Sequence, residues 1–249
     1  MSPRAVIQFI SEGRAHFQCG RRSLRPALSL KAFAAENGGW EGKWVLVIHS
    51  GGDSKRVPQY SALGKLFSPV PHMLPDERSS TLFDEFLIAM SAVPGRIREG
   101  MLLLSGDVLL LFNPLLIDWS GSGAAVISFK EDVETGKDHD VYLRGADGSV
   151  KQFLHKQSIQ TLQSVGAVNE SNMVDIDTGA ILLGVDVLNS LWSLVSTDSV
   201  FSLSLYNQFV NDKVRLSLYG DIQYPLASDS TLKAFYNPEC VTQNRSSIA

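Results

Sequence analysis

The 249-residue sequence is poor in cysteine and lacks long apolar runs. Its two cysteines, Cys19 and Cys240, lie far apart and outside any CxxC or metal-spaced histidine pattern, so a structural zinc site is not expected. Two cysteines without a disulfide framework are typical of a reducing compartment. No apolar run approaches the length of a membrane span, and the first residues lack a signal-peptide core. These absences predict a cytoplasmic protein with no membrane partner.

Charge is also scarce, because only 19% of the residues are charged and the net charge is −4 at pH 7. Such a chain has no global basic field, so nucleic acid is not an expected partner. A polyanion would need a local concentration of cations, and Lys55, Arg56 and Lys65 provide one. The hydrophobic share of 44% suits one large globular domain, or one domain with a short appendage.

The stretch between Lys43 and Pro71 has the features of a phosphate-binding site. An apolar, β-branched run at 44–48 predicts a fully buried strand. Two glycines follow, Gly51 and Gly52, which let the backbone turn sharply and approach a ligand. Successive N–H groups in such a turn can point at one anion. A surface hairpin with solvated charges is the alternative, and the glycine pair alone would favour it.

A second buried strand is predicted over 100–108, with Asp107 near its end. A helix predicted over 80–90, with Ser80 as its cap, separates the two strands and implies a parallel sheet. Ligands of open α/β sheets bind outside the carboxyl ends of the strands, where Asp107 and the glycine turn are both expected. Asp107 is interpreted as a Mg²⁺ ligand, with phosphates and water completing the shell. A turn aspartate is the alternative interpretation.

The motif H-S-G-G-D-S-K-R-V-P at 49–58, followed by G-K-L-F-S-P-V-P at 64–71, resembles the opening motif of sugar-1-phosphate nucleotidyltransferases. It looks closest to the fucose-1-phosphate guanylyltransferase branch, which includes the pyrophosphorylase half of bifunctional fucokinase/GDP-fucose pyrophosphorylases. The resemblance implies an α/β fold with a Rossmann-like mixed, mostly parallel sheet flanked by helices. It also implies that GTP and fucose 1-phosphate are converted into GDP-fucose and pyrophosphate.

The resemblance implies roles for the residues of this motif. Arg56 would neutralise the departing pyrophosphate, and Lys65 would bridge the sugar phosphate or the α-phosphate. Asp107 would hold Mg²⁺. The residues assigned to nucleotide binding are Ser50, Gly51, Gly52, Asp53, Ser54 and Lys55. Ser54 and Lys55 depart from most pyrophosphorylases but are shared by the fucose branch.

Two later segments resemble sugar-phosphate motifs of the family. The segment at 153–158 is similar to L-x-K-P-S/T, with Gln157 in place of proline, and it implies that Lys156 contacts a sugar phosphate. An exposed lysine at a helix start is the alternative. The D-T-G triplet at 177–179 matches the family's D-T-G or D-I-G, where the sugar is contacted, and implicates Asp177 and Gly179. A turn aspartate before glycine is again the alternative.

A third segment departs from the family. His139-Asp140-Val141 stands where the family tends to have His-Gly-Val, so the close backbone approach to the sugar is expected to be altered. For His139, a metal or base role and a solvated loop position were equally consistent with the sequence.

The domain prediction is an N-terminal appendage at 1–40, a nucleotidyltransferase-like domain at 41–236 and a frayed or truncated tail at 237–249. The Gly-rich, Thr-containing segment that precedes the first motif in family members is not found, so either the gene start is truncated or the chain is a fragment. The sequence gives no indication of the oligomeric state, and base and sugar specificity depend on loop geometry.

Two other function classes remain open. One is a non-catalytic or incomplete domain of an L-fucokinase-type protein that binds nucleotide or sugar phosphate, and the departures at Asp140, Gln157 and Ala227 favour it. The other is a glycosyltransferase with an Asp-x-Asp metal motif. The run Asp175-Ile176-Asp177 has that spacing, but it comes late in the chain, whereas the metal aspartate is expected after an early strand.

Overall fold

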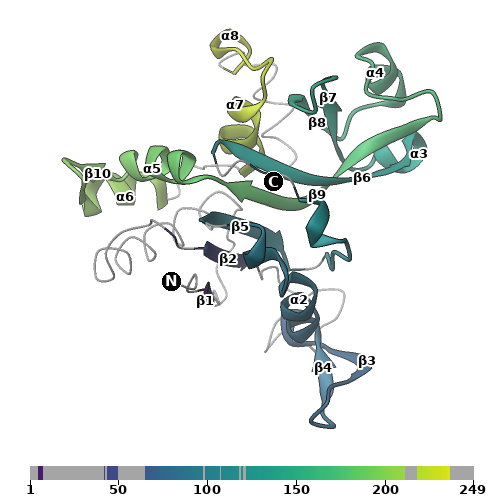
Figure 1. Ribbon diagram of the computed structural model, residues 1–249. Helices are drawn as coiled ribbons and strands as arrows, with labels where there is room; N and C mark the ends of the chain where they lie inside the picture. The colour runs from purple at the N-terminus through teal and green to yellow at the C-terminus, as the bar shows by residue number, and fades with distance from the viewer. Residues whose placement is uncertain are drawn as a thin grey trace. The chain divides into compact units, whose positions relative to one another are not determined.

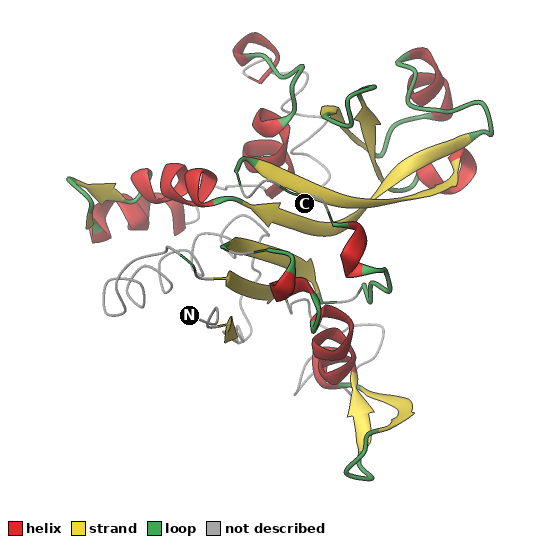
Figure 2. Ribbon diagram, viewed as in Figure 1, coloured by secondary structure: helices red, strands yellow, loops and turns green. Residues whose placement is uncertain are grey.

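A computed structural model describes residues 5–7, 42, 44–49, 65–97, 99–106, 108–117, 119, 122–210 and 218–235. The described chain mixes helices and strands, as the predicted α/β class requires (Figures 1 and 2). It divides into two compact units. Among the described residues, the first unit contains those before Val126 together with Gly179–Leu194, and the second contains Val126–Thr178 and those from Val195 onward.

Parallel strands form the centre of the first unit. In spatial order they are β1 (Ala5–Ile7), β2 (Trp44–His49) and β5 (Gly100–Ser105). The side chains at 44–47 and 101–104 are buried, as predicted for apolar strands that are covered on both faces. Since a helix separates β2 from β5 in the chain, the predicted strand–helix–strand unit is confirmed.

The remaining pairings described for the sheet are antiparallel, which corrects the prediction of a mostly parallel, Rossmann-like sheet. Strand β9 (Met173–Leu183) runs antiparallel to β5. Strand β7 (Asp140–Arg144) runs antiparallel to both β8 (Val150–His155) and β9. A short turn joins β7 to β8, and such a connection permits only antiparallel pairing. The observed sheet is therefore mixed and mostly antiparallel.

The helix between β2 and β5, α2 (Leu82–Met90), begins at a capping box. The N–H of Asp84 donates to Oγ1 of Thr81 (3.3 Å), and the N–H of Thr81 donates to Oδ2 of Asp84 (2.8 Å). The predicted cap, Ser80, is wrong by one residue, because strand β4 (Ser79–Thr81) continues up to Thr81.

The apolar face predicted for α2 is buried. Phe86 and Met90 have exposed fractions of 0% and 2%, while Leu82 is half-buried. Helix α5 (Val185–Ser193) packs on β5 and buries Trp192. The other short elements of this unit are η2 (Lys65–Phe67), β3 (Pro69–Met73), η3 (Val93–Gly95) and η4 (Pro114–Leu116).

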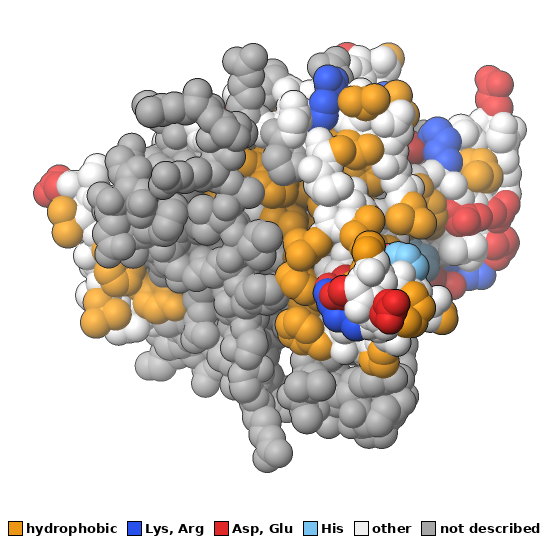
Figure 3. Space-filling view, turned by 60° about the horizontal axis from the view of Figure 1, so that its bottom comes forward, with side chains coloured by type: hydrophobic (Ala, Val, Ile, Leu, Met, Phe, Trp, Pro, Cys, Tyr) orange, Lys and Arg blue, Asp and Glu red, His pale blue; other side chains and the backbone are white. Residues whose placement is uncertain are grey.

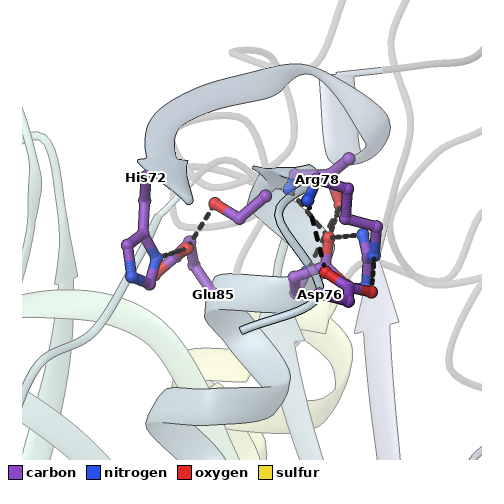
Figure 4. A network of polar contacts seen from close by, with 7 residues as sticks. His72, Asp76, Arg78 and Glu85 are labelled. Atoms are coloured by element: carbon purple, nitrogen blue, oxygen red, sulfur yellow. Dashed lines mark hydrogen bonds and ion pairs between the residues drawn. The ribbon is translucent and has the colours of Figure 1, made fainter. Parts of the chain in front are cut away.

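A polar network ties the β3–β4 hairpin to the first turn of α2 (Figure 4). Arg78 donates from Nη1 and Nη2 to the two carboxylate oxygens of Asp84, at 2.9 Å each, and from Nε to Asp76 at 3.0 Å. Oε1 of Glu85 lies 2.7 Å from Nδ1 of His72. The hairpin comes to the front in Figure 3, where acidic, basic and histidine side chains lie close together. Two strands alone are marginally stable, so this network supplies contacts that the hairpin needs.

The second unit is built on the β7–β8 hairpin and the N-terminal part of β9. The dipeptide Asp147-Gly148 predicts a hairpin turn, and the structure confirms it, because Leu143 pairs with Gln152 on either side of the turn. Most of β6 (Ala124–Asp132) also belongs here and pairs with β9. The apolar run at 124–129 predicts a buried strand; the strand forms, but it is not buried, since Phe129 is 48% exposed.

The core of the second unit lies on one face of these strands. It consists of Val133, Val141, Leu162, Val174 and Ile176. Two short helices border it, α3 (Val133–Gly136) and α4 (Ile159–Ser164). Ser158 caps α4, because its Oγ accepts a hydrogen bond from the N–H of Thr161 (3.2 Å).

The C-terminal part of the described chain covers the β7–β8 hairpin. The N–H groups of Ser228 and Asp229 donate to the carbonyl oxygens of Val150 and Lys151 (2.9 and 3.1 Å). The sequence at 213–221 predicts a strand, but 218–221 are helical; 213–217 lie outside the described residues. Elements of this part are β10 (Ser196–Thr197), β11 (Val200–Phe201), α6 (Leu203–Val210), the π-helix η5 (Leu218–Gln223), α7 (Tyr224–Leu226) and α8 (Leu232–Phe235). None of the helices formed by the described residues has the length and apolar character needed to cross a membrane.

We expect Asp84→Asn to weaken the acid dependence of stability. Hydrogen bonds from Arg78 and Thr81 hold the pKa of Asp84 well below its usual range. A carboxyl group whose pKa is lower in the folded state stabilises the protein above its unfolded-state pKa of about 4. This stabilisation is lost as the pH falls through the folded-state pKa. The variant should therefore melt below wild type at pH 7, with a gap that narrows towards about pH 2. Circular dichroism melts across this range measure it.

Asp76→Asn is the matched control, because Asp76 also accepts from Arg78 but caps no helix. Its melting temperature should stay near that of wild type throughout. A constant gap between Asp84→Asn and wild type at every pH would contradict the proposed role of the Asp84 charge.

Candidate functional site

Most residues predicted to bind nucleotide and metal lie outside the described residues, including Ser50, the segment 51–56 and Asp107. The strands that lead into both segments are described. His49, the last residue of β2, pairs with Ser105, the last residue of β5, and the two strands are parallel. Both segments therefore begin at one edge of the sheet, at the carboxyl ends where α/β sheets bind ligands. The individual assignments stay predictions.

Lys65, whose backbone is described, begins η2 next to α2. The residue after it, Leu66, is buried with 2% exposed, and the ring of Phe67 packs against Phe83 of α2 with centroids 5.7 Å apart. The N–H of Leu82 donates to the carbonyl oxygen of Ser68 (3.0 Å). The sequence Lys-Leu-Phe-Ser thus anchors the Lys65 backbone to the start of α2.

Gly179 lies against the carboxyl end of β5. Its φ is +72°, a left-handed conformation that favours glycine. A Cβ at this position would lie 3.1 Å from Cβ of Ser105, two residues before Asp107. The D-T-G triplet therefore needs its glycine for conformation and for space. This places Gly179 beside the strand end that leads to the predicted metal ligand.

Asp175 and Asp177 lie on the same face of β9, because side chains alternate along a strand. Nζ of Lys130 on β6 is 3.0 and 3.1 Å from the two carboxylate oxygens of Asp175. Ile176, between the aspartates, and Thr178, after the second one, are buried, and Oγ1 of Thr178 donates to the carbonyl oxygen of Ile127. Asp177 is half-buried and has contacts of its own. The polar residues at 175–179 predict a loop that enters a buried strand, but the D-T-G segment is part of the strand itself.

The contact between Lys130 and the carboxylate of Asp175 argues against Asp175-Ile176-Asp177 as an Asp-x-Asp metal motif. A lysine ammonium already neutralises this group, so a divalent cation would have to displace it. Within the described ranges, no group of three His, Cys, Asp or Glu side chains has the arrangement of a metal site.

Lys156 follows β8 directly and is exposed, as both interpretations of its sequence require. Its φ is +43°, which is uncommon for a residue with a side chain. The next residue, Gln157, donates from Nε2 to the carbonyl oxygen of His155 (2.9 Å). The glutamine that replaces the family's proline therefore supports the backbone at this bend.

Sequence reasoning missed the partner of Asp140. In the hairpin, Asp140 pairs with His155, and Oδ1 of Asp140 lies 2.5 Å from Nδ1 of His155. Counting outward from the turn at 147–148 would have found this pair. The neighbouring histidine, His139, is exposed and precedes the strand.

A family model described as the fucose pyrophosphorylase domain matches residues 37–248. Among curated proteins, a bifunctional fucokinase/GDP-fucose pyrophosphorylase of Arabidopsis thaliana is 26% identical over 194 residues, which cover 72% of this chain and 18% of that protein. Fucose-1-phosphate guanylyltransferases of Mus musculus and Homo sapiens are 26% and 24% identical over 231 residues, which cover 84% of this chain and 38% and 37% of theirs. The chain thus spans 18% to 38% of the length of these relatives.

We expect Gly179→Ala to lower the free energy of unfolding more than Gly166→Ala does. Both glycines have positive φ, of +72° and +78°, so both variants should lose about 1–2 kcal/mol to backbone strain. Only at Gly179 would the new Cβ meet a neighbour, because nothing lies within 4 Å of the position at Gly166. Urea denaturation of the two variants measures the difference.

A double variant isolates that contact. Ser105→Gly removes the Cβ that the new methyl group would meet, so it should recover part of the loss in Gly179→Ala, with a coupling of at least about 0.5 kcal/mol. Strictly additive losses would show that Gly179 is needed for its conformation alone.

Proposed function

The chain belongs to the fucose pyrophosphorylase domain family, as the resemblance of its opening motif indicated, and on this basis we propose that it is a sugar-1-phosphate nucleotidyltransferase. The favoured substrates are GTP and fucose 1-phosphate, and the products are GDP-fucose and pyrophosphate. The names of the mouse and human relatives support this choice. The family match over 37–248 is the observation that carries the proposal.

The proposed reaction is a single displacement at phosphorus. An oxygen of the sugar phosphate attacks the α-phosphorus of GTP and forms a new P–O bond. The bond from the α-phosphorus to the α,β-bridging oxygen breaks, and its electron pair leaves with pyrophosphate. Catalysis then depends on aligning two polyanions and neutralising their charge, with little need for a protein nucleophile.

The edge of the sheet at His49 and Ser105 suits this task, because both segments that carry the predicted residues begin there. The Gly51–Gly52 turn would hold the nucleotide phosphates through backbone N–H groups. Arg56 would neutralise the departing pyrophosphate. Lys65, anchored through Leu66 to α2, would bridge the sugar phosphate or the α-phosphate.

The donor set expected at this edge fits Mg²⁺. The ion takes oxygen ligands and is held in phosphoryl-transfer enzymes by one or two carboxylates and by the substrate phosphates. Asp107, two residues after the end of β5, would supply such a carboxylate. Bound Mg²⁺ would screen the phosphate charges.

The sugar phosphate is assigned to Lys156, Asp177 and Gly179. Lys156 is an exposed cation at a strand end, which suits a phosphate. Asp177 is a half-buried carboxylate, which suits sugar hydroxyl groups as an acceptor. A glycosyltransferase is disfavoured, because Lys130 contacts both oxygens of Asp175 in the Asp-x-Asp run.

We expect the 249-residue chain, given GTP, fucose 1-phosphate and Mg²⁺, to release pyrophosphate. Arg56→Ala and Lys65→Ala should each lower kcat by about 10²–10³-fold, the typical effect of removing a group that stabilises developing charge. Lys137→Ala is the matched control, since Lys137 is exposed and pairs with Glu134. A coupled pyrophosphate assay measures all four proteins.

Full turnover in Arg56→Ala or Lys65→Ala would remove that residue from the mechanism. Binding of GTP by the folded wild-type chain without pyrophosphate release would overturn the catalytic proposal and leave a nucleotide-binding domain.

We expect Asp107→Ala to remove the response to Mg²⁺. In wild type the rate should rise with Mg²⁺ and saturate, because the carboxylate and the phosphates share the ion. The variant should show little activity at any Mg²⁺ concentration that saturates wild type. An unchanged saturation curve in Asp107→Ala would place the metal ligand elsewhere.

A further inference from the structure

Asp140 and His155 form a close pair of oppositely chargeable groups at the end of the β7–β8 hairpin away from its turn. Oδ1 of Asp140 and Nδ1 of His155 are 2.5 Å apart, and their side chains are only 13% and 12% exposed. Polar groups that have lost this much water need partners, because burial of an unpaired charge is costly. The pair does not belong to the apolar core, since Val141, the next residue along, faces that core.

Strand register extends this pair into a row across three strands. Val141 pairs with Ile176, and Tyr142 with Asp175. Continuing this register by one residue places Asp177 opposite Asp140, on the face away from Ile176. The row therefore consists of Asp177 on β9, Asp140 on β7 and His155 on β8. Lys156 is the next residue after His155 along the chain.

The same face carries an aromatic row beside the polar one. Tyr142 and Phe153 pack with ring centroids 5.6 Å apart and are buried. Gln223 lies over Tyr142, with Nε2 donating to its hydroxyl (3.4 Å). Asp140 and His155 keep some exposure next to this covered surface. A partly open polar row bordered by a packed aromatic surface is typical of a small-molecule site.

The backbone around the pair is fixed from two sides. The side chain of His155 meets Asp140, and its carbonyl oxygen accepts from Gln157. Lys156, between His155 and Gln157, has the left-handed φ of +43°. Such conformations persist where the surroundings hold them, and they cluster at ligand sites. The contacts of His155 and Gln157 thus lie on either side of Lys156.

We propose that Asp140 and His155 complete the sugar 1-phosphate site between Asp177 and Lys156. Asp140 accepts hydrogen bonds from hydroxyl groups of the sugar, and His155 positions the carboxylate of Asp140. A carboxylate has about four acceptor sites, so the contact with His155 does not exhaust it. This inference rests on the proposed function, because it names the residues that recognise the sugar of that substrate.

Charge decides which part of the substrate lies where. Asp140 and Asp177 are acceptors and repel a phosphate, whereas hydroxyl groups are donors that suit them. The ammonium of Lys156, one residue beyond His155, attracts the phosphate instead. A sugar phosphate therefore fits this row with its ring over the carboxylates and its phosphate towards Lys156. The family's glycine at position 140 would offer backbone only, so Asp140 makes this recognition specific to the chain.

Asp140→Asn keeps the size of the side chain and removes its charge. Hydrogen bonds to a charged group are stronger, so we expect KM for fucose 1-phosphate to rise by about 10-fold to 100-fold, with KM for GTP unchanged. His155→Gln should raise KM for fucose 1-phosphate by a smaller factor. In the double variant, the fold-increase in this KM should be smaller than the product of the two single-variant factors. Asp147→Asn is the matched control, because Asp147 lies at the turn of the same hairpin and accepts from Ser149.

Comparing KM for fucose 1-phosphate with KM for GTP distinguishes a role of Asp140 in sugar recognition from a role in folding. A purely structural role would lower the melting temperature and leave KM for fucose 1-phosphate unchanged, or raise both KM values together. Either result in folded Asp140→Asn would overturn the inference. A selective rise in KM for fucose 1-phosphate, absent from Asp147→Asn, would support it.

Direct binding separates this inference from the proposed function. Fucose 1-phosphate and inorganic phosphate are titrated into wild type and Asp140→Asn and followed by NMR. The inference would be supported if Asp140→Asn bound fucose 1-phosphate more weakly than wild type but bound inorganic phosphate equally well. This holds even if wild type releases no pyrophosphate. Equal binding by both proteins would overturn the inference and leave the proposed function intact. No binding of fucose 1-phosphate by wild type would overturn both.

Discussion

Backbone hydrogen bonding along β9 is the constraint on which the described site residues depend. Pairing with β5 fixes residues 181–183, and pairing with β7 fixes 175–176. A shift of one residue in either register would turn every side chain to the opposite face. Gly179 lies between these two paired stretches with positive φ, so the strand changes its local conformation where the D-T-G triplet ends. The triplet is thus a structural element of the strand as well as a candidate binding motif.

Charged side chains have different tasks in the two units. In the first unit, Arg78 and Asp84 join a hairpin to a helix start, and no substrate is needed to explain them. In the second unit, Lys130 and Asp175 join β6 to β9. The Asp140–His155 pair differs, because both of its side chains are largely buried, at 13% and 12% exposed, whereas Arg78 and Lys130 are each 52% exposed. This contrast is why the latter pair, and not the larger network, is assigned to ligand recognition.

Sequence reasoning succeeded where local rules suffice and failed where pairing partners are distant. Apolar runs located β2 and β5, and their parallel order followed from the helix between them. The same rule failed for β9, because a helix, α4, also precedes this strand in the chain and yet β9 runs antiparallel to β5 and β7. Nothing local states which strand β9 will join. The cap of α2 was misplaced by one residue, because β4 pairs with β3 up to Thr81 and delays the helix.

The sequence by itself determined the family, the two buried strands and the turn of the β7–β8 hairpin. These features depend on residue type, spacing and short-range geometry, which are written along the chain. Only the tertiary structure decided the antiparallel direction of β9, the neutralisation of Asp175 by Lys130, and the register of β9 against β7 that brings Asp177 to the Asp140–His155 pair. Such contacts join segments tens of residues apart, and their register is selected by the burial of whole faces.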